Sequence, residues 1–268
     1  MTTYLLWEKP RKTAFQMHID RSSGLHFLWA APRSVSTAFG RCMAAHPDVT
    51  LVHEPFTETY HFGPERKSMR YGELPPSIPE SSFTAKAVND RLRDEAASKV
   101  VFVKELAFQG EPFVEDDLIL RSTHFLIVRR PAVVAASLKK LKPDFSEDEF
   151  GFQAIHRIWK RCLGSSKNVM IVDGDHFRAH PHVVIDAVCA RLGLVFQTSM
   201  MAWKTGTIKR WESHEQASQA RWHRTLEGSR TILPPVPLQS DPLSNLTFAQ
   251  QKIVHDADRL YHEILGGQ

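Results

Sequence analysis

Cysteine is scarce in this sequence. The 268 residues include only three, Cys42, Cys162 and Cys189, and none of them stands at a spacing typical of metal sites. An odd and small number of cysteines argues against a disulfide framework and favours a reducing compartment. Long apolar runs and an apolar leader are lacking too, so we expect no membrane span and no signal peptide, and we predict a cytoplasmic protein.

Neither sign of charge dominates the sequence. The 34 lysines and arginines against 30 acidic residues leave a formal net charge of +4. The basic residues occur as short pairs and do not gather on one element, as they do in many nucleic-acid-binding proteins. We therefore expect no nucleic-acid partner and favour small anionic ligands. The sequence carries no signal for an oligomeric state.

Short apolar runs alternate with amphipathic segments. We expect buried strands at 25–30, 49–53, 100–104, 124–129 and 168–172, and helices at 36–45, 83–99, 131–141, 144–163, 182–192 and 246–265. This alternation predicts an α/β fold, P-loop-like, with three α/β/α layers and a central, mostly parallel sheet of about five strands. Ligands of such sheets bind at the carboxyl ends of the strands.

The chain is long enough for one large domain with a substantial core. We expect residues 1–24 to form an N-terminal arm and 25–268 a single domain, in which 196–268 shapes the cofactor and acceptor sites. Residues 57–81 are rich in proline and have no sustained period, so a long loop is expected there.

The first strand ends at Pro32 and leads into a segment rich in hydroxyl groups. Ser34, Ser36 and Thr37 are residue types that cap helix N-termini, where N–H groups and the helix dipole attract anions. Arg33 adds a permanent positive charge. A nucleoside-triphosphate loop requires the pattern Gly-x-x-x-x-Gly-Lys-Ser/Thr, and this segment has neither the glycines nor the lysine. By itself the segment is equally compatible with a plain strand–helix connection.

Two motifs further narrow the interpretation. Residues 32–37 resemble the Pro-Arg/Lys-Ser-Gly-Thr-Thr motif with which sulfotransferases bind 3′-phosphoadenosine 5′-phosphosulfate (PAPS), with Val35 in place of the usual glycine. The family's second motif, a strand ending in Arg-x-Pro with a serine in the next helix, matches Arg129, Pro131 and Ser137. The forms Leu-Trp-x-x-Pro-Arg-Ser-x-Ser-Thr-Ala-Phe and His-Glu-Pro-Phe are similar to a bacterial branch of that family often found with natural-product pathways.

The resemblance implies a set of cofactor-binding residues and no metal. That set comprises Pro32, Arg33, Ser34, Val35, Ser36 and Thr37 around the 5′-phosphosulfate, Arg129 and Ser137 at the 3′-phosphate, and Lys209 and Arg210 in a late basic loop. Arg130 stands at a position where the family commonly has an acidic residue. Trp203, Trp211 and Trp222 are candidates for stacking on adenine or on an aromatic acceptor.

The catalytic assignments start from Lys104, because many sulfotransferases have a lysine here that contacts the sulfuryl or bridging oxygen. A strand-end lysine at the surface is an equally good interpretation. The catalytic histidine that many cytosolic members carry two residues later is replaced by Leu106. We predict that Glu54 is the base, since a partly desolvated carboxyl group has a raised pKa. His53 is the second candidate, although strand alternation turns it into the core, and Arg33 neutralises the leaving group.

The predicted activity is transfer of a sulfuryl group from PAPS to a hydroxyl of a small, apolar or aromatic acceptor by in-line displacement. Two alternatives stay open, a P-loop-like kinase or nucleotide hydrolase and a non-catalytic nucleotide-binding module. Asp173 and Asp175 resemble a magnesium-binding pair, but we expect them to cap the following helix.

Overall fold

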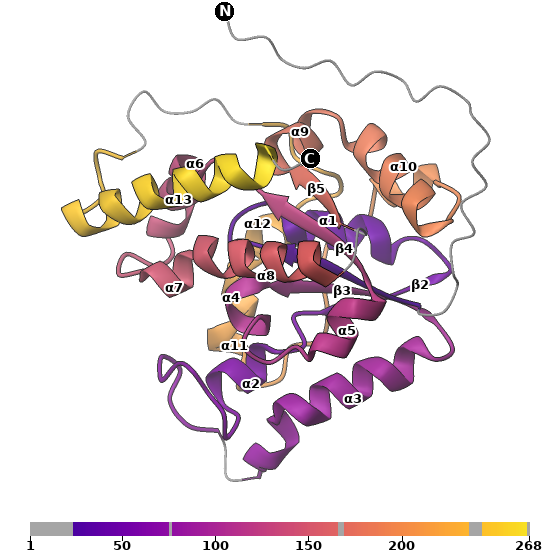
Figure 1. Ribbon diagram of the computed structural model, residues 1–268, viewed down its shortest axis with the longest axis horizontal. Coiled ribbons are helices and arrows are strands. Elements are labelled where there is room, and N and C mark those ends of the chain that lie inside the picture. Colours follow the sequence, from indigo (N-terminus) through magenta and orange to yellow (C-terminus); the bar gives the residue numbers. More distant parts are fainter. Residues whose placement is uncertain (1–23, 75–76, 166–168, 236–242, 267–268) are drawn as a thin grey trace, which may run out of the picture.

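Five parallel strands form the centre of the molecule (Figure 1). The computed structural model describes residues 24–74, 77–165, 169–235 and 243–266, so most of the predicted N-terminal arm lies outside the described residues. The strands are β1 (Leu25–Ala30), β2 (Val49–His53), β3 (Val100–Leu106), β4 (Thr123–Val128) and β5 (Val169–Asp173), in the order β2-β3-β1-β4-β5. The predicted α/β fold with five strands is confirmed, and all strand pairs are parallel.

Strand alternation sends side chains to two separate cores. Phe27, Trp29 and Leu126 belong to the core on one face of the sheet, whereas Leu28 and Phe125 belong to the core on the other. The first face is covered by α3 (Ala85–Ala96), α4 (Ala107–Gly110), α5 (Asp116–Arg121), α6 (Pro131–Lys139), α7 (Glu147–Phe150), α8 (Phe152–Ser165) and α13 (Phe248–Gly266). The second is covered by α1 (Ser36–Ala44), α9 (Gly174–Ala179) and α10 (Pro181–Leu192). These layers confirm the three-layer arrangement.

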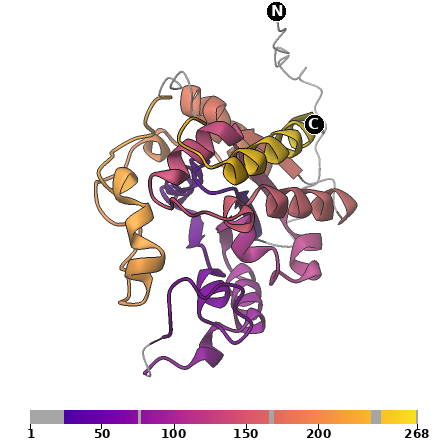
Figure 2. The ribbon, with the colours of Figure 1, turned by 90° about the vertical axis from the view of Figure 1, so that its left-hand side faces the viewer.

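The position of β1 in the middle of the sheet determines where ligands can bind. The chain leaves β1 toward β2 and β3 on one side and later crosses to β4 and β5 on the other side. The loops after β1 and β4 therefore diverge at the carboxyl edge, which is where open parallel sheets bind ligands. Residues of η2 (Thr198–Met201), α11 (Glu215–Ser218), η3 (Ala220–Trp222) and α12 (Arg224–Glu227) form an additional segment, orange in Figure 2, along one side of the molecule.

Two local predictions are wrong. The expected loop 57–81 begins with a helical turn, α2 (Thr57–His61), directly after the His-Glu-Pro-Phe sequence, and the short η1 (Glu80–Phe83) precedes α3. The expected helix 144–163 is split into α7 and α8 by Gly151, whose φ is +80°. A glycine adopts this left-handed conformation without steric cost, so it ends α7 and starts α8 in a new direction.

Gly151 also fixes the loop after β1. A Cβ atom at Gly151 would lie 2.9 Å from Cδ of Pro32. Gly72 has a similar left-handed φ of +73°, yet a Cβ there would meet nothing within 4 Å. A side chain at either glycine would strain the backbone, but only a side chain at Gly151 would also crowd the loop after β1.

We predict that Gly151→Ala destabilises the protein more than Gly72→Ala. Both alanines carry the left-handed strain of about 1–2 kcal/mol, and only the Gly151 variant adds an overpacking cost of about 1–3 kcal/mol against Pro32. Urea unfolding of both variants measures the difference in free energy of unfolding. Equal losses would show that Gly151 does not support the loop.

Candidate active site

Three non-glycine residues in the described part of the chain have a left-handed backbone. They are Arg33 (φ 60°), Val35 (φ 73°) and Glu54 (φ 47°), and all lie in the turns that follow β1 and β2. Such residues cost about 1–3 kcal/mol each and persist only where the surrounding structure holds them. Their concentration at one edge of the sheet marks this edge as the candidate site.

The first turn of α1 is open to a ligand. Its N-cap is Val35, which makes no side-chain capping hydrogen bond, and the hydroxyl of Ser34 donates instead to the carbonyl of Ala31 at 2.6 Å. The prediction that the Ser34 hydroxyl caps the helix is therefore wrong. The amides at the start of this nine-residue helix stay available, so they and the positive end of the helix dipole suit an anion.

The structure joins the two sequence motifs through one side chain. Nε of Arg33 donates to Oγ of Ser137 at 3.0 Å, although the two residues are 104 positions apart, and Nη1 of Arg33 donates to the carbonyl of Trp222 at 3.1 Å. Burial lowers the pKa of Arg33, and the nearby charge of Arg129 lowers it further. Two guanidinium groups close to each other are a suitable partner for a phosphate group.

Arg129 is held in place by Asp175. Nε of Arg129 donates to Oδ1 of Asp175 at 2.7 Å, and Nε of Arg130 donates to Oδ2 of the same carboxylate at 3.1 Å. Asp173 caps α9 as predicted, accepting from the amide of His176 at 2.7 Å. The expectation that Asp175 also caps this helix is wrong, because its carboxylate bridges the two arginines.

A cleft of about 800 Å³ lies beside these residues, and we call it the donor cleft. It is lined by Arg33, Val35, Ser36, Thr37, Ala38, Arg129, Ser137, Arg178, Trp222, His223, Thr225, Leu226 and Leu233. Six of the predicted cofactor-binding residues are therefore brought together here. Arg178, a third arginine, also lines it; burial lowers its pKa, and the charge of Arg129 acts in the same direction.

The predicted late basic loop lies elsewhere. The lysine Lys209 forms an ion pair with Glu215 and sits 5.2 Å from the ring centre of Trp211. Neither Lys209 nor Arg210 is among the described residues that line the donor cleft. The contact of these two residues with a 3′-phosphate thus stays a prediction without support from their positions.

Glu54 and Lys104 form a buried ion pair at the ends of β2 and β3. The amide of Glu54 donates to the carbonyl of Lys104 at 2.7 Å, and Nζ of Lys104 donates to Oε1 of Glu54. Only 1% of the Lys104 side chain is exposed, which rules out a surface lysine. Burial acts to raise the pKa of Glu54, but the charge of Lys104, together with the hydrogen bond from it, outweighs burial and lowers this pKa to about 2. The predicted raised pKa of Glu54 is therefore wrong in this state.

Two histidines accompany the ion pair. Nε2 of His53 lies 3.7 Å from Oε1 of Glu54 and has no hydrogen-bond partner among the described residues. Burial lowers the pKa of His53 well below its usual value and lowers that of His223 to about 4. The two rings meet edge to face, with centroids 5.1 Å apart, and His223 stacks on Trp211. Both imidazoles are thus neutral near pH 7.

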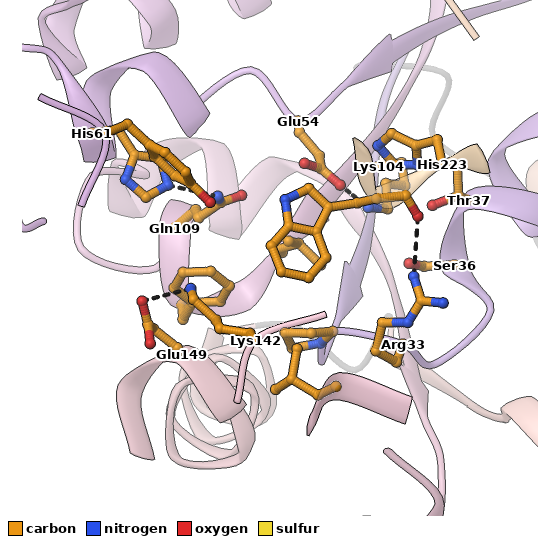
Figure 3. Close-up of a pocket in the computed structure, with 16 residues that line it drawn as sticks. Arg33, Ser36, Thr37, Glu54, His61, Lys104, Gln109, Lys142, Glu149 and His223 are labelled. Carbon is orange, nitrogen blue, oxygen red and sulfur yellow. Dashed lines mark hydrogen bonds and ion pairs between the residues drawn. The ribbon is translucent and has the colours of Figure 1, made fainter. Parts of the chain in front are cut away.

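A second pocket opens on the other side of the ion pair, and we call it the acceptor pocket (Figure 3). The space between its walls, part of which is open to solvent, amounts to about 640 Å³. It is lined by Pro32, Arg33, Ser36, Thr37, Glu54, His61, Tyr71, Lys104, Leu106, Phe108, Gln109, Leu138, Lys142, Glu149, Trp222 and His223. Arg33, Ser36, Thr37, Trp222 and His223 line both cavities, so the two meet at the loop after β1.

Two groups of side chains have the composition of metal sites. His53, Glu54 and His223 have potential ligand atoms within 4.8 Å of one another, and so do Glu58, His214 and Glu215. In each group a lysine pairs with a carboxylate, Lys104 with Glu54 and Lys209 with Glu215. A cation would have to displace these ammonium groups, and the expectation that no metal is needed stays a prediction.

Two residues of the site had no signal in the sequence, His223 in a segment without readable periodicity and Arg178 in a short helix. Asp175 is singled out in the sequence but is expected there to cap a helix and not to bind Arg129. Arg178 is a basic residue in the sequence, but its distance along the chain from Arg129 does not indicate that the two lie close together. Of the three tryptophans singled out, Trp222 lines both cavities.

A comparison with protein-family profiles identifies the family of the chain. A family profile described as "Sulfotransferase domain" matches residues 26–240. The branched-chain-amino-acid aminotransferase-like protein 2 of Arabidopsis thaliana is 24% identical over 224 residues, which cover 83% of this chain and 39% of the relative. Protein 1 of the same name and organism is 27% identical over 182 residues, covering 67% and 32%. The chain therefore spans about a third of the length of the curated relatives it matches.

Solved structures with related folds are distant. The sulfotransferase domain of the Synechococcus PCC 7002 olefin synthase has a TM-score of 0.47 and 15% identity, covering 87% of this chain and 93% of that chain. Mouse sulfotransferase SULT7A1, solved in complex with PAP, has a TM-score of 0.45 and 12% identity, covering 90% and 83%. Because these scores are low, the fold class rests on the parallel sheet itself. No helix among the described residues is long and apolar enough to cross a membrane.

We predict that Lys104→Met lowers the free energy of unfolding by about 3–5 kcal/mol near pH 7, because it leaves the Glu54 carboxylate buried without a counter-charge. In the parent the Glu54 pKa is depressed, so the pair stabilises above the unfolded-state pKa of about 4.3 and loses this effect as the pH falls toward 2. In the variant burial alone raises this pKa, so protonation restores stability as the pH falls.

Urea unfolding between about pH 5 and pH 8 measures this difference. The double variant Lys104→Met with Glu54→Gln is the control, since it removes both charges and recovers most of the loss. A pH-independent loss in the single variant would contradict the burial of an unpaired carboxylate.

Proposed function

The chain belongs to the sulfotransferase domain family, and on that basis we propose that it transfers a sulfuryl group from PAPS to a hydroxyl group of a small acceptor. The observation that carries this proposal is the hydrogen bond between Arg33 and Ser137, which unites two anion-binding motifs at the boundary of two cavities. The donor cleft offers arginines for phosphate groups, and the acceptor pocket offers a carboxylate for a hydroxyl proton.

The residues of the donor cleft fit a nucleotide with phosphate groups at two positions. The uncapped first turn of α1, with Ser36 and Thr37, would hold the 5′-phosphosulfate, and Arg33 would neutralise its charge. Arg129 and Ser137 would hold the 3′-phosphate, with Asp175 keeping the arginine in position. Bound there, PAPS supplies an activated sulfuryl group on a phosphate leaving group.

The transfer step follows from the two cavities meeting at the loop. The acceptor oxygen forms a bond to sulfur while the bond from sulfur to the 5′-phosphate oxygen breaks, and its electron pair stays on the phosphate. Arg33, Lys104 and the amides of α1 stabilise the charge that develops on that phosphate. The hydroxyl proton passes to the carboxylate of Glu54.

The Lys104–Glu54 pair makes the basicity of Glu54 depend on binding of the donor. In the structure the ammonium of Lys104 holds the Glu54 pKa near 2, where the carboxylate is a weak base. An anion in the loop would draw the ammonium away from Glu54. The buried carboxylate would then lose its main counter-charge, and its pKa would rise toward the range useful for a base.

His223 is a second candidate for the base. Its neutral imidazole lines both cavities, and the family's usual histidine position is occupied here by Leu106, which lines the acceptor pocket. His53 is a weaker candidate, because it lines neither cavity. Glu54 stays our first choice, since it combines an ionised carboxylate with direct contact to Lys104.

The walls of the acceptor pocket indicate the class of acceptor. Apolar walls from Leu106, Phe108, Leu138 and Trp222 favour a small acceptor with an apolar or aromatic body. We propose a cytoplasmic enzyme of small-molecule, natural-product metabolism that forms one catalytic domain over residues 25–268. The Arabidopsis relatives are named for an aminotransferase, and the chain spans about a third of their length, so that name suggests no activity here.

We predict that 3′-phosphoadenosine 5′-phosphate raises the melting temperature more than ATP with magnesium. A ligand at a hundredfold excess over its Kd adds about 2.7 kcal/mol of stability, which corresponds to roughly 5–10 °C for a domain of this size. Arg129→Ala should weaken this binding about tenfold to a hundredfold, whereas Arg130→Ala, its more exposed neighbour on Asp175, should change it little. No shift with the bisphosphate would exclude a sulfotransferase, and a larger shift with ATP and magnesium would favour a kinase or hydrolase.

We also predict that Glu54→Gln keeps bisphosphate binding and loses turnover about 10²- to 10⁴-fold, the usual effect of a general base. His223→Gln and His53→Gln are the matched variants. Single-turnover rates with a phenol acceptor distinguish the three positions. A fully active Glu54→Gln with an inactive His223→Gln would move the base to His223 without changing the reaction class.

A further inference from the structure

The acceptor pocket has a second charged end that the transfer step does not use. Lys142 and Glu149 form an ion pair of 2.5 Å at this end, apart from the Lys104–Glu54 pair (Figure 3), and Trp222 lines the same pocket. His61 and Gln109 line the same end. A pocket with ionisable groups at both ends selects a ligand with matching groups at both ends.

Lys142 is a buried ammonium with unused donors. Its side chain is 7% exposed, and burial lowers its pKa even though Glu149 acts in the opposite direction. Glu149 is its one ion-pair partner among the described residues, and its Nζ lies 5.8 Å from the ring centre of Trp222. An ammonium group has three N–H donors, and a buried one gains most from a second anionic partner.

Glu149 does not depend on Lys142. Arg70 donates two hydrogen bonds to the Glu149 carboxylate, of 2.6 Å and 2.9 Å, and the amide of Ser146 donates a third at 3.1 Å. Asp144 binds the outer side of Arg70 and is largely exposed. Arg70 thus holds Glu149 in place independently of Lys142 and is itself also paired with Asp144, whereas Lys142 has Glu149 as its one ion-pair partner among the described residues.

His61 adds a polar group without a charge. It is buried, and its pKa is lowered to about 3, chiefly by burial and then by the charge of Lys142. Its Nδ1 has no hydrogen-bond partner among the described residues, and its Nε2 lies 3.5 Å from Nε2 of Gln109. This nitrogen is therefore available to a water molecule or to a polar group of a ligand at this end of the pocket.

We infer that the acceptor carries a carboxylate or similar anionic group, which binds Lys142 while its hydroxyl reaches Glu54. This inference rests on the proposed sulfuryl transfer and deepens it. The body of the acceptor packs against Trp222, Phe108 and Leu138, and the neutral His61 donates a hydrogen bond to it or accepts one from it. An acceptor with a cationic end is disfavoured, because its charge would face the ammonium of Lys142, which lines the pocket.

Phenols of graded length test the inference. We would compare 4-hydroxybenzoate, 4-hydroxyphenylacetate and 3-(4-hydroxyphenyl)propionate with 4-ethylphenol and tyramine, using PAPS as donor. At least one carboxylate should exceed 4-ethylphenol in kcat/KM by about tenfold or more, mainly through KM, since the charge-assisted hydrogen bond forms on binding. Tyramine should be poorer than 4-ethylphenol.

The variant Lys142→Gln should lower kcat/KM for the preferred carboxylate about tenfold or more relative to kcat/KM for 4-ethylphenol, so that the ratio of the two approaches one. Lys140→Gln, an exposed lysine in the same turn, is the matched control and should keep the preference. Glu149 stays bound to Arg70 in the variant, so the fold should survive. Stabilisation by 3′-phosphoadenosine 5′-phosphate verifies the donor cleft separately.

The outcomes separate the inference from the proposed function. Sulfation of phenols without a carboxylate preference, or an equal loss for all acceptors in Lys142→Gln, would overturn the inference alone. Absence of both bisphosphate binding and transfer to any phenol would overturn the proposed function. A carboxylate preference that Lys142→Gln leaves intact would move the anion subsite away from Lys142 and contradict the inference.

Discussion

The buried ion pair between Lys104 and Glu54 is the interaction on which the rest of the site depends. Two opposite charges with almost no access to water are stable only if they stay together. The pair lies where β2 and β3 are already joined by the backbone hydrogen bond from Glu54 to Lys104, and Glu54 has a left-handed backbone there. Glu105, fully buried beneath, accepts hydrogen bonds from the amides of Phe56 and Leu106 and so holds the turn after Glu54 in place.

The strand order explains why distant motifs meet. With β1 central, the loop that carries Arg33 lies beside the turn after β4, where Arg129 begins the approach to α6 and Ser137. The loops after β1 and β4 leave the same edge of the sheet in opposite directions. Residues from both loops therefore line the donor cleft. The segment carrying Trp222 and His223 then separates this cleft from the acceptor pocket.

Much of this could be predicted from the sequence, since short apolar runs ending in charged residues identify parallel strands and their functional edge. The strands followed from this logic, whereas the assignment of Arg33 and Ser137 to one ligand came from the family resemblance, and their direct hydrogen bond was not predicted. The break at Gly151 was not predicted either, because helical periodicity continues across it. The depressed pKa of Glu54 needs a three-dimensional neighbour, Lys104, which lies 50 positions away. His223 lies in a segment where short helical turns leave no period to detect.

Electrostatics links this architecture to its ligands. Arg33, Arg129 and Arg178 lie around one cleft, and the Asp175 carboxylate that pairs with Arg129 is shared with Arg130. Their mutual repulsion and burial lower the pKa values of Arg33 and Arg178. A bound dianion would relieve this cost, so affinity for the donor and stability of the loop should rise together. The same reasoning applies at the acceptor end, where the buried charge of Lys142 is only partly balanced by Glu149.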